Sequence, residues 1–345
     1  MTTETGSLDA APADVSSTEI GPSALALDGW LAWNEERWGL TPLRVCYGQS
    51  APDRPRLEGV LYLTRRGRVR MPPRNPYLPF RFCPSATARV ERRERQWLEL
   101  CSEFAEDLRR RGLDGPIQLS PGLLDARPLQ WLGFEVALRY TYVLPLPWRE
   151  AGAPGSIRKA IRRARQTELT VDRSERFDAL HECLEATEAD KSFSHETPPE
   201  TLERLHLLLG PEHFHAFAAR DACGRVVSAL LTLHVPQGTL IGWSAGTLRE
   251  FRSTGVAQLA YQAAIHDASE AGARQFDMAG ANIRAVASAK AQWGAPLVPY
   301  LEISDRGTGA TRLARSLVRA ARALTADVRL GRRSARDRRP GPGGA

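Results

Sequence analysis

The residues best placed to do chemistry form a turn that opens a helix. They are Arg252, Ser253, Thr254, Gly255, Val256 and Ala257. The first backbone N–H groups of a helix have no internal partner and lie at the positive end of its dipole. Small residues let a phosphate approach these groups closely, and Arg252 adds a positive charge. The turn therefore predicts a phosphate site, with Ser253 or Thr254 as helix cap, although an ordinary capped helix after a loop has the same pattern.

Further polar residues follow that helix. A buried strand is expected over residues 274–278 with Asp277 near its end, and Asn282 stands in the loop that opens a second, shorter helix. Lys290 lies on that short helix, and a strand over residues 297–303 comes next. A cleft opens where strands of an open sheet end. We therefore expect Asp277 or Asn282 to orient a substrate amine.

A histidine beside a glutamate is the candidate general base. His195 and Glu196 lie in a polar loop between helices expected over residues 176–189 and 199–209. Imidazole titrates near neutrality, and a neighbouring carboxylate can orient it for proton transfer. An exposed loop without a catalytic role would contain the same pair, so both interpretations stay open.

Two successive runs of elements position these residues. The first run has a helix from Asp28, a long helix over residues 91–111, a short helix over 123–132, and strands over 43–47, 57–64, 117–120 and 137–144. The second run starts with a strongly basic helix, capped by Ser156, and continues with strands over residues 213–220, 226–235 and 239–245. The Pro-rich residues 72–77, within the first run, are expected to be irregular.

The order of the second run resembles the GNAT acyltransferase fold. Its last part, with Asp277, Gly280, Lys290 and the pair Trp293-Gly294, resembles the FemAB-like branch, whose members carry two GNAT-type domains in tandem. The resemblance implies an α/β (α+β) fold of two such domains, each a mixed, mostly antiparallel sheet flanked by helices. It also implies that the turn at residues 252–257 binds the pyrophosphate of acyl-coenzyme A, and that the first domain is degenerate and forms the acceptor side.

The predicted domains follow from these runs. Residues 1–27 form a disordered N-terminus, 28–147 the first GNAT-like domain, and 148–305 the second, catalytic domain. Residues 306–345 form a basic amphipathic helix and a disordered, Arg-rich end. This tail could contact an anionic membrane or RNA, or it could be a solvated tail.

The resemblance predicts an N-acyltransferase that moves an acyl group, with acetyl expected, from acyl-coenzyme A to an amine. Lys290 is the recurring cation of the FemAB-like pattern, and we expect it to stabilise an oxyanion or to hold an anionic group. The tyrosine that many GNAT enzymes carry on this helix is absent, since Ala289 and Lys290 stand there. Two alternatives remain: a transferase that takes its group from aminoacyl-tRNA and acts on a cell-wall precursor or natural-product amine, and a catalytically silent scaffold.

Composition sets the remaining bounds. The net charge is +7, but residues 312–345 hold ten arginines against two aspartates, which leaves residues 1–311 at −1. No C-x-x-C pair occurs, so neither a metal site nor a disulfide framework is expected. No apolar run is long enough to span a membrane and no signal peptide is recognisable, which predicts a cytoplasmic protein. The widely spaced cysteines are Cys46, Cys83, Cys101, Cys183 and Cys223.

Overall fold

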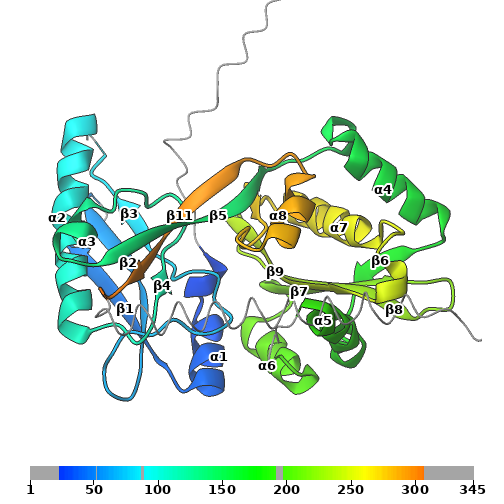
Figure 1. Ribbon diagram of the computed structural model, residues 1–345, viewed down its shortest axis with the longest axis horizontal. Coiled ribbons are helices and arrows are strands. Elements are labelled where there is room, and N and C mark those ends of the chain that lie inside the picture. Colours follow the sequence, from blue (N-terminus) through cyan, green and yellow to red (C-terminus); the bar gives the residue numbers. More distant parts are fainter. Residues whose placement is uncertain (1–22, 52, 87–88, 192–196, 307–345) are drawn as a thin grey trace, which may run out of the picture.

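The computed structural model describes residues 23–51, 53–86, 89–191 and 197–306 of the chain. Two halves lie side by side along the longest axis of the molecule (Figure 1). The pair His195-Glu196 and the basic helix predicted for the tail lie outside the described residues. Within the described residues, no helix is both long and apolar enough to cross a membrane.

The first half is built around one long helix, α2. Trp97, Cys101, Phe104 and Leu108 recur every three or four residues on α2 and are buried, as the amphipathic pattern predicts. This face packs on a three-stranded sheet of order β1-β2-β3. The elements are η2 (Ala24–Ala26), α1 (Asp28–Trp38), β1 (Thr41–Gly48), β2 (Arg56–Leu63), β3 (Arg81–Cys83), α2 (Val90–Arg111), β4 (Ile117–Gln118), α3 (Arg127–Trp131) and β5 (Glu135–Pro145).

The second half is a sheet with helices on both faces. In Figure 1, α5 and α6 lie below the strands β7, β8 and β9, whereas α7 lies above them with α4 and α8 beside it. The elements are η3 (Glu150–Gly152), α4 (Gly155–Gln166), β6 (Thr170–Arg173), α5 (Phe177–Lys191), α6 (Pro199–Leu209), β7 (Phe214–Arg220), β8 (Val226–Leu233), β9 (Thr239–Thr247), η4 (Arg249–Phe251), α7 (Val256–Glu270), β10 (Gln275–Asp277), α8 (Arg284–Ala291) and β11 (Leu297–Ser304).

One sheet of eight strands runs through both halves, in the order β4-β11-β5-β10-β9-β8-β7-β6. The last strand of the first half, β5, lies between β11 and β10 and pairs antiparallel with both. The last described strand, β11, returns to pair with β4 of the first half. The boundary predicted after Pro147 therefore separates two runs of sequence but not the sheet.

The mixed, mostly antiparallel fold predicted from the sequence is confirmed, with corrections at the helix starts. The predicted cap Ser156 is wrong, because α4 begins at Gly155 after Pro154, and no side chain caps it. Pro154 is the N-cap residue, and its backbone is extended, with φ −54° and ψ 146°. The cap predicted for α7 at Ser253 or Thr254 is also wrong, because its N-cap is Gly255, with φ 89°, and no side chain caps the helix. The sequence pattern does not predict the short strands β3 and β6.

Gly255 should tolerate a side chain poorly. A Cβ at Gly255 would lie 2.0 Å from the carbonyl oxygen of Ala160 on α4, and its φ is +89°. Gly133 is a matched control, because its φ is +88° and no heavy atom lies within 4 Å of its Cβ position. We expect Gly133→Ala to cost about 1 kcal/mol for the backbone alone. Gly255→Ala should cost roughly 1–3 kcal/mol more, since α4 must move.

Urea unfolding of the two variants measures this difference. Equal losses of unfolding free energy would contradict the close contact between α4 and the turn at Gly255.

Candidate active site

The site predicted from the sequence lies where two parallel strands separate. Strands β9 and β10 pair only from Gln275 with Thr239 to Asp277 with Ile241. After Asp277 the chain leaves the sheet, whereas β9 continues to Thr247. In the described part of the chain, β9 beyond Ile241 therefore has no neighbouring strand on its β10 side. The backbone groups of β9 that face this side make no strand-to-strand hydrogen bonds, whereas β9 stays paired with β8 on its other side.

A bulge lies on β9 at the point of separation. Ser244 pairs with Leu231 and Gly242 pairs with Thr232, so Trp243 is an extra residue opposite β8. A bulge leaves backbone groups outside the ladder and turns the strand. Acyl transfer needs preorganised donors for the oxygen that gains charge. The bulge is therefore a candidate oxyanion site. The sequence did not predict it, because the sequence of β9 alone does not show how β9 pairs with β8.

The predicted phosphate turn follows β9 and opens α7. The hydroxyl of Thr254 accepts a hydrogen bond from the N–H of Val256 at 3.3 Å, but Thr254 is not the N-cap that the sequence predicted. No described residue accepts from the backbone N–H groups of Ala257 and Gln258. Two donors of the first helical turn are therefore available to an anion.

Arg252 has partners within the protein. Its guanidinium donates to the carbonyl of Ala186 on α5 at 3.0 Å and to that of Thr247 at 3.4 Å. These bonds fix the turn to α5 and to the end of β9. The phosphate contact expected of Arg252 stays a prediction.

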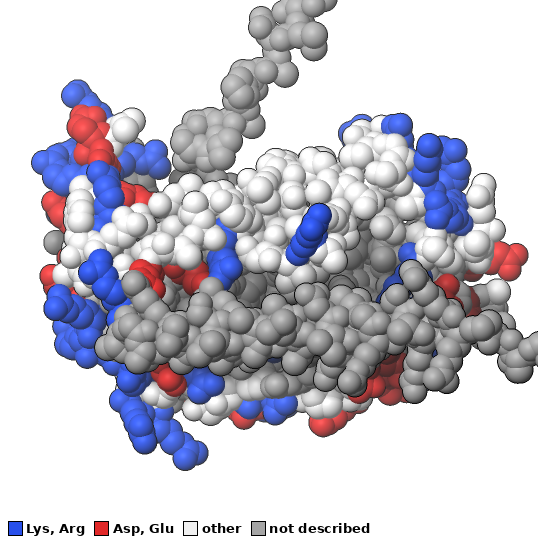
Figure 2. Space-filling model, viewed as in Figure 1, with Lys and Arg blue, Asp and Glu red and all other residues white. Residues whose placement is uncertain are grey.

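The basic helix α4 lies against the same turn. Arg163 on α4 donates to the carbonyl of Ser253, and Gly255 packs against the backbone of Ala160. Lys159 and Arg162 are exposed on this helix. Figure 2 shows the resulting blue surface over α4, at the right end of the molecule. The fold thus brings a group of positive side chains next to the positive end of the α7 dipole.

Asp277 is buried at the junction of the two halves and is only 2% exposed. One carboxylate oxygen accepts from the hydroxyl of Thr141 at 2.6 Å and from the N–H of Ala279 at 2.8 Å. The other accepts from the hydroxyl of Tyr77 in the first half. Burial, and then the charge of Asp277, raise the pKa of Tyr77 well above its usual value, so this hydroxyl stays protonated. The predicted contact of Asp277 with a substrate amine stays a prediction.

Lys290 is turned toward the loop that follows β10. Its ammonium donates to the carbonyls of Met278, Ala279 and Gly280, the last two at 2.9 Å and 2.8 Å. Ala279 and Gly280 have positive φ, 52° and 81°. Three donors of one ammonium thus hold three successive carbonyls of a left-handed loop. Sequence reasoning expected an oxyanion or an anionic group as the partner of Lys290, and that contact stays a prediction.

The side chain of Asn282 makes hydrogen bonds to β5 and β11. Its carbonyl oxygen accepts from the backbone N–H of Tyr140 at 3.0 Å, and its amide donates to the hydroxyl of Tyr300 at 2.9 Å. Burial is the largest cause that raises the pKa of Tyr300, which keeps this hydroxyl protonated. Asn282 therefore joins the loop to β5 and β11, and its contact with substrate stays a prediction.

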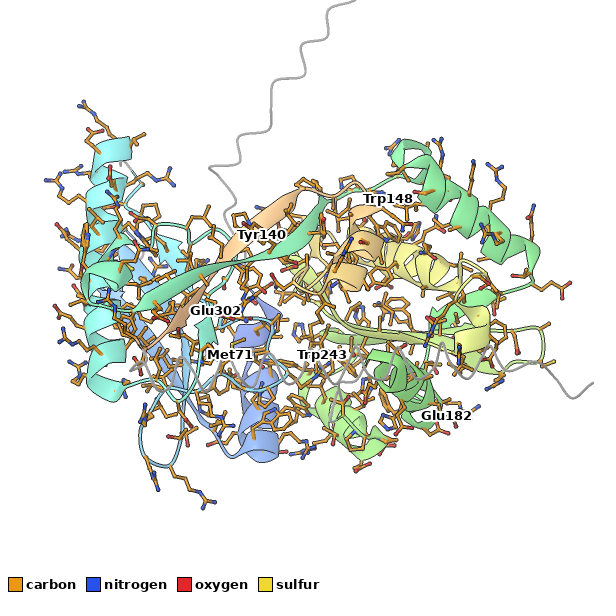
Figure 3. All side chains as sticks on the ribbon, in the orientation of Figure 1. Met71, Tyr140, Trp148, Glu182, Trp243 and Glu302 are labelled. Atoms are coloured by element: carbon orange, nitrogen blue, oxygen red, sulfur yellow. The ribbon has the colours of Figure 1, made fainter. Side chains whose placement is uncertain are left out.

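The first half reaches both separated strands through residues 72–77. The backbone carbonyl of Arg74 accepts from the indole N–H of Trp243 at 2.9 Å, and Tyr77 donates to Asp277. In Figure 3, Trp243 lies at the centre of the molecule, where the two halves meet. Sequence reasoning identified this segment as an irregular Pro-rich loop but gave no signal for its partners, which are more than 160 residues away in the chain.

The described residues contain no group of three or more His, Cys, Asp and Glu side chains that could hold a metal ion. His195 and Glu196 lie outside the described residues, so their role as a base stays a prediction.

Residues 154–285 match the family model described as an acetyltransferase (GNAT) domain. No curated protein sequence matches the chain. Among solved structures, FemX is similar with a TM-score of 0.59 and 13% identity, over 83% of this chain and 93% of FemX.

A second similar structure is the C-terminal domain (DUF2156) of an Agrobacterium fabrum protein designated a lysylphosphatidylglycerol synthetase. Its TM-score is 0.50 at 13% identity, over 79% of this chain and 87% of that domain. At this level of identity both likenesses concern the fold, whereas the match over residues 154–285 concerns the sequence. Residues 154–285 therefore match a GNAT acetyltransferase domain, and the chain has a fold like that of FemX.

Proposed function

We propose that this protein is an N-acyltransferase that moves an acyl group, acetyl being the simplest, from acyl-coenzyme A to an amine. One observation carries the proposal. The parallel strands β9 and β10 separate after Ile241 and Asp277, and a bulge at Trp243 lies at that point. The same strand β9 leads into the helix start where two N–H groups lack a described acceptor. A donor with a phosphate end and a carbonyl end fits this order.

The chemistry assigns one task to each part. Phosphates of the donor would lie at the first turn of α7, near Ala257 and Gln258. The thioester carbonyl would lie at the bulge of β9, whose backbone donors stabilise the oxygen as the amine attacks. The C–N bond forms as the C–S bond breaks, and the amine loses a proton to a base. Coenzyme A leaves as its thiolate, which takes up a proton from water. We propose His195 with Glu196 as that base.

We propose that Lys290 acts mainly as a positioning residue. Its ammonium holds the carbonyls of the loop at residues 278–280, which starts where β10 leaves β9. A neutral side chain would leave these carbonyls without their donor. A direct effect on charge in the transition state would add to this role.

Aminoacyl-tRNA is the second candidate donor. It is favoured by the exposed cations Lys159 and Arg162 on α4, which lies against the start of α7. A polyphosphate chain gains affinity from such a group of charges. The acceptor could then be a cell-wall precursor or a natural-product amine. A scaffold without activity would use the same surface only for binding.

The reaction would take place in the cytoplasm, where acyl-coenzyme A and aminoacyl-tRNA are made. A contact of the Arg-rich tail with an anionic membrane concerns residues outside the described part, and it stays a prediction.

A negative charge at the start of α7 should weaken donor binding without unfolding the protein. We expect Gln258→Glu to bind acetyl-coenzyme A at least about tenfold more weakly, because two unit charges about 6 Å apart repel by roughly 3 kcal/mol at an effective dielectric of 20. Acidic side chains suit the first turn of a helix, so the melting temperature should not fall. Isothermal titration calorimetry measures the affinity. Gln258→Ala is the neutral control and should bind nearly as the wild type does.

Equal affinities of Gln258→Glu and wild type would show that the phosphates bind elsewhere.

Replacing Lys290 should affect both stability and turnover. We expect Lys290→Met to lower the free energy of unfolding by about 1–3 kcal/mol, because three carbonyls that are at least partly buried lose a charged donor. Turnover should fall further than the loss of folded protein explains, by up to about 10²-fold. Lys290→Arg should restore only part of both, since a planar guanidinium does not fit three adjacent carbonyls as an ammonium does.

Release of free thiol from acetyl-coenzyme A with a mixture of primary amines measures the turnover. Wild-type stability and turnover in Lys290→Met would show that Lys290 neither holds the loop nor contributes to the reaction.

Substitutions on α4 distinguish aminoacyl-tRNA from acyl-coenzyme A as the donor. If aminoacyl-tRNA is the donor, Lys159→Glu combined with Arg162→Glu should weaken tRNA binding and reduce its salt slope by about 2. If acyl-coenzyme A is the donor, the wild type should show no tRNA binding at roughly 200 mM salt. Mobility shifts with unfractionated tRNA at two salt concentrations measure this. Arg92→Glu combined with Arg93→Glu, on exposed positions of α2, is the control for a general charge effect.

A further inference from the structure

Residues 72–77, which we call the clamp loop, contact the bulge of β9 through Arg74. The carbonyl of Arg74 accepts from the indole N–H of Trp243 at 2.9 Å. Its guanidinium carbon lies 5.4 Å from the centre of the Trp243 ring, within the range of a cation–π contact. The guanidinium also donates to the hydroxyl of Ser244 at 3.3 Å. One residue of the first half therefore contacts both the extra residue of the bulge and the residue after it.

The opposite end of the clamp loop contacts β10. Tyr77 is 4% exposed, and its hydroxyl donates to the carboxylate of Asp277, the last residue of β10. The ring of Tyr77 also packs edge-on against Tyr300 of β11, with 6.1 Å between the ring centres. Arg74 and Tyr77 are three residues apart, and each contacts one of the two strands that separate.

Both ends of this arrangement are held firmly. After the clamp loop, the N–H of Leu78 donates to the carbonyl of Gln118 at 2.7 Å, on β4 at the edge of the eight-stranded sheet. The Trp243 ring, which contacts Arg74, also packs edge-on against Trp30 and Trp33 of α1, with 5.5 Å and 5.7 Å between ring centres. The bulge is thus enclosed between α1 and Arg74, and both belong to the first half.

We propose that the clamp loop sets the distance between β9 and β10, with Arg74 and Tyr77 as positioning residues for the acyl group. The inference rests on the proposed function, because it concerns the same bulge and the same strands. Arg74 fixes the backbone that receives the acyl oxygen, and Tyr77 fixes the strand end beside it through Asp277. The first half is therefore part of the acyl site as well as the acceptor side.

The test compares acetyl-coenzyme A with coenzyme A, which differ only in the acyl group. In Arg74→Gln and in Tyr77→Phe, we expect the ratio of the two affinities to fall about fivefold or more, which corresponds to a lost hydrogen bond at the acyl oxygen. The affinity for coenzyme A itself should stay near that of the wild type. Arg74→Lys keeps a cation over the Trp243 ring and should recover part of the ratio.

Arg66→Gln is the matched control, because Arg66 is exposed on a turn of the same half and the charge change is the same. Hydrogen exchange of the amides at residues 242–245 is the second readout. It should become faster in Arg74→Gln and Tyr77→Phe but not in Arg66→Gln.

A lower melting temperature with an unchanged affinity ratio and unchanged exchange would overturn the proposal. If the wild type binds neither acetyl-coenzyme A nor coenzyme A, the proposed donor is wrong. Hydrogen exchange of residues 242–245 then still tests whether the clamp loop fixes the bulge. Faster exchange in both variants supports this role, and unchanged exchange overturns it.

Discussion

The carboxylate of Asp277 is the constraint on which the arrangement of the two halves depends. A buried charge is costly unless hydrogen bonds replace the lost water. Asp277 receives such bonds from Tyr77 in the first half, from Thr141 on β5 and from Ala279 in its own loop. All three donors must be in place together, so the charge is satisfied only when both halves have assembled around the end of β10.

The strand order also makes the site depend on both halves. Because β5 lies between β11 and β10, the first half supplies a central strand to the sheet that holds the site. Lys290 and Asn282 then fix the loop after β10, through the carbonyls of residues 278–280 and through β5. A rigid scaffold of this kind preorganises backbone donors, which is what acyl transfer requires of a protein that forms no covalent intermediate. Catalysis in the second half would therefore depend on contacts made by the first.

Local patterns in the sequence predict much of this fold, but not the partners of its polar residues. The periodicity of α2 and the turn before α7 are properties of adjacent residues, and both are present in the structure, although the N-cap of α7 is Gly255 and not Ser253 or Thr254. The burial of Asp277, the carbonyl partners of Lys290 and the reach of Arg74 to Trp243 depend on how distant segments pack. The cap predicted at Ser156 is wrong because α4 already begins at Gly155, with Pro154 as its N-cap residue. The roles of His195 and Glu196 stay predictions, since they lie outside the described residues.

The central claim is that the separated strands and the start of α7 hold an acyl-coenzyme A. Native mass spectrometry of the full-length protein, purified without added ligand and then mixed with acetyl-coenzyme A, tests it most directly. We expect a one-to-one complex with acetyl-coenzyme A, and we expect the small molecules released on denaturation to include coenzyme A or an acyl derivative of it. A protein that forms no such complex, and that instead carries RNA which ribonuclease removes, would contradict the claim.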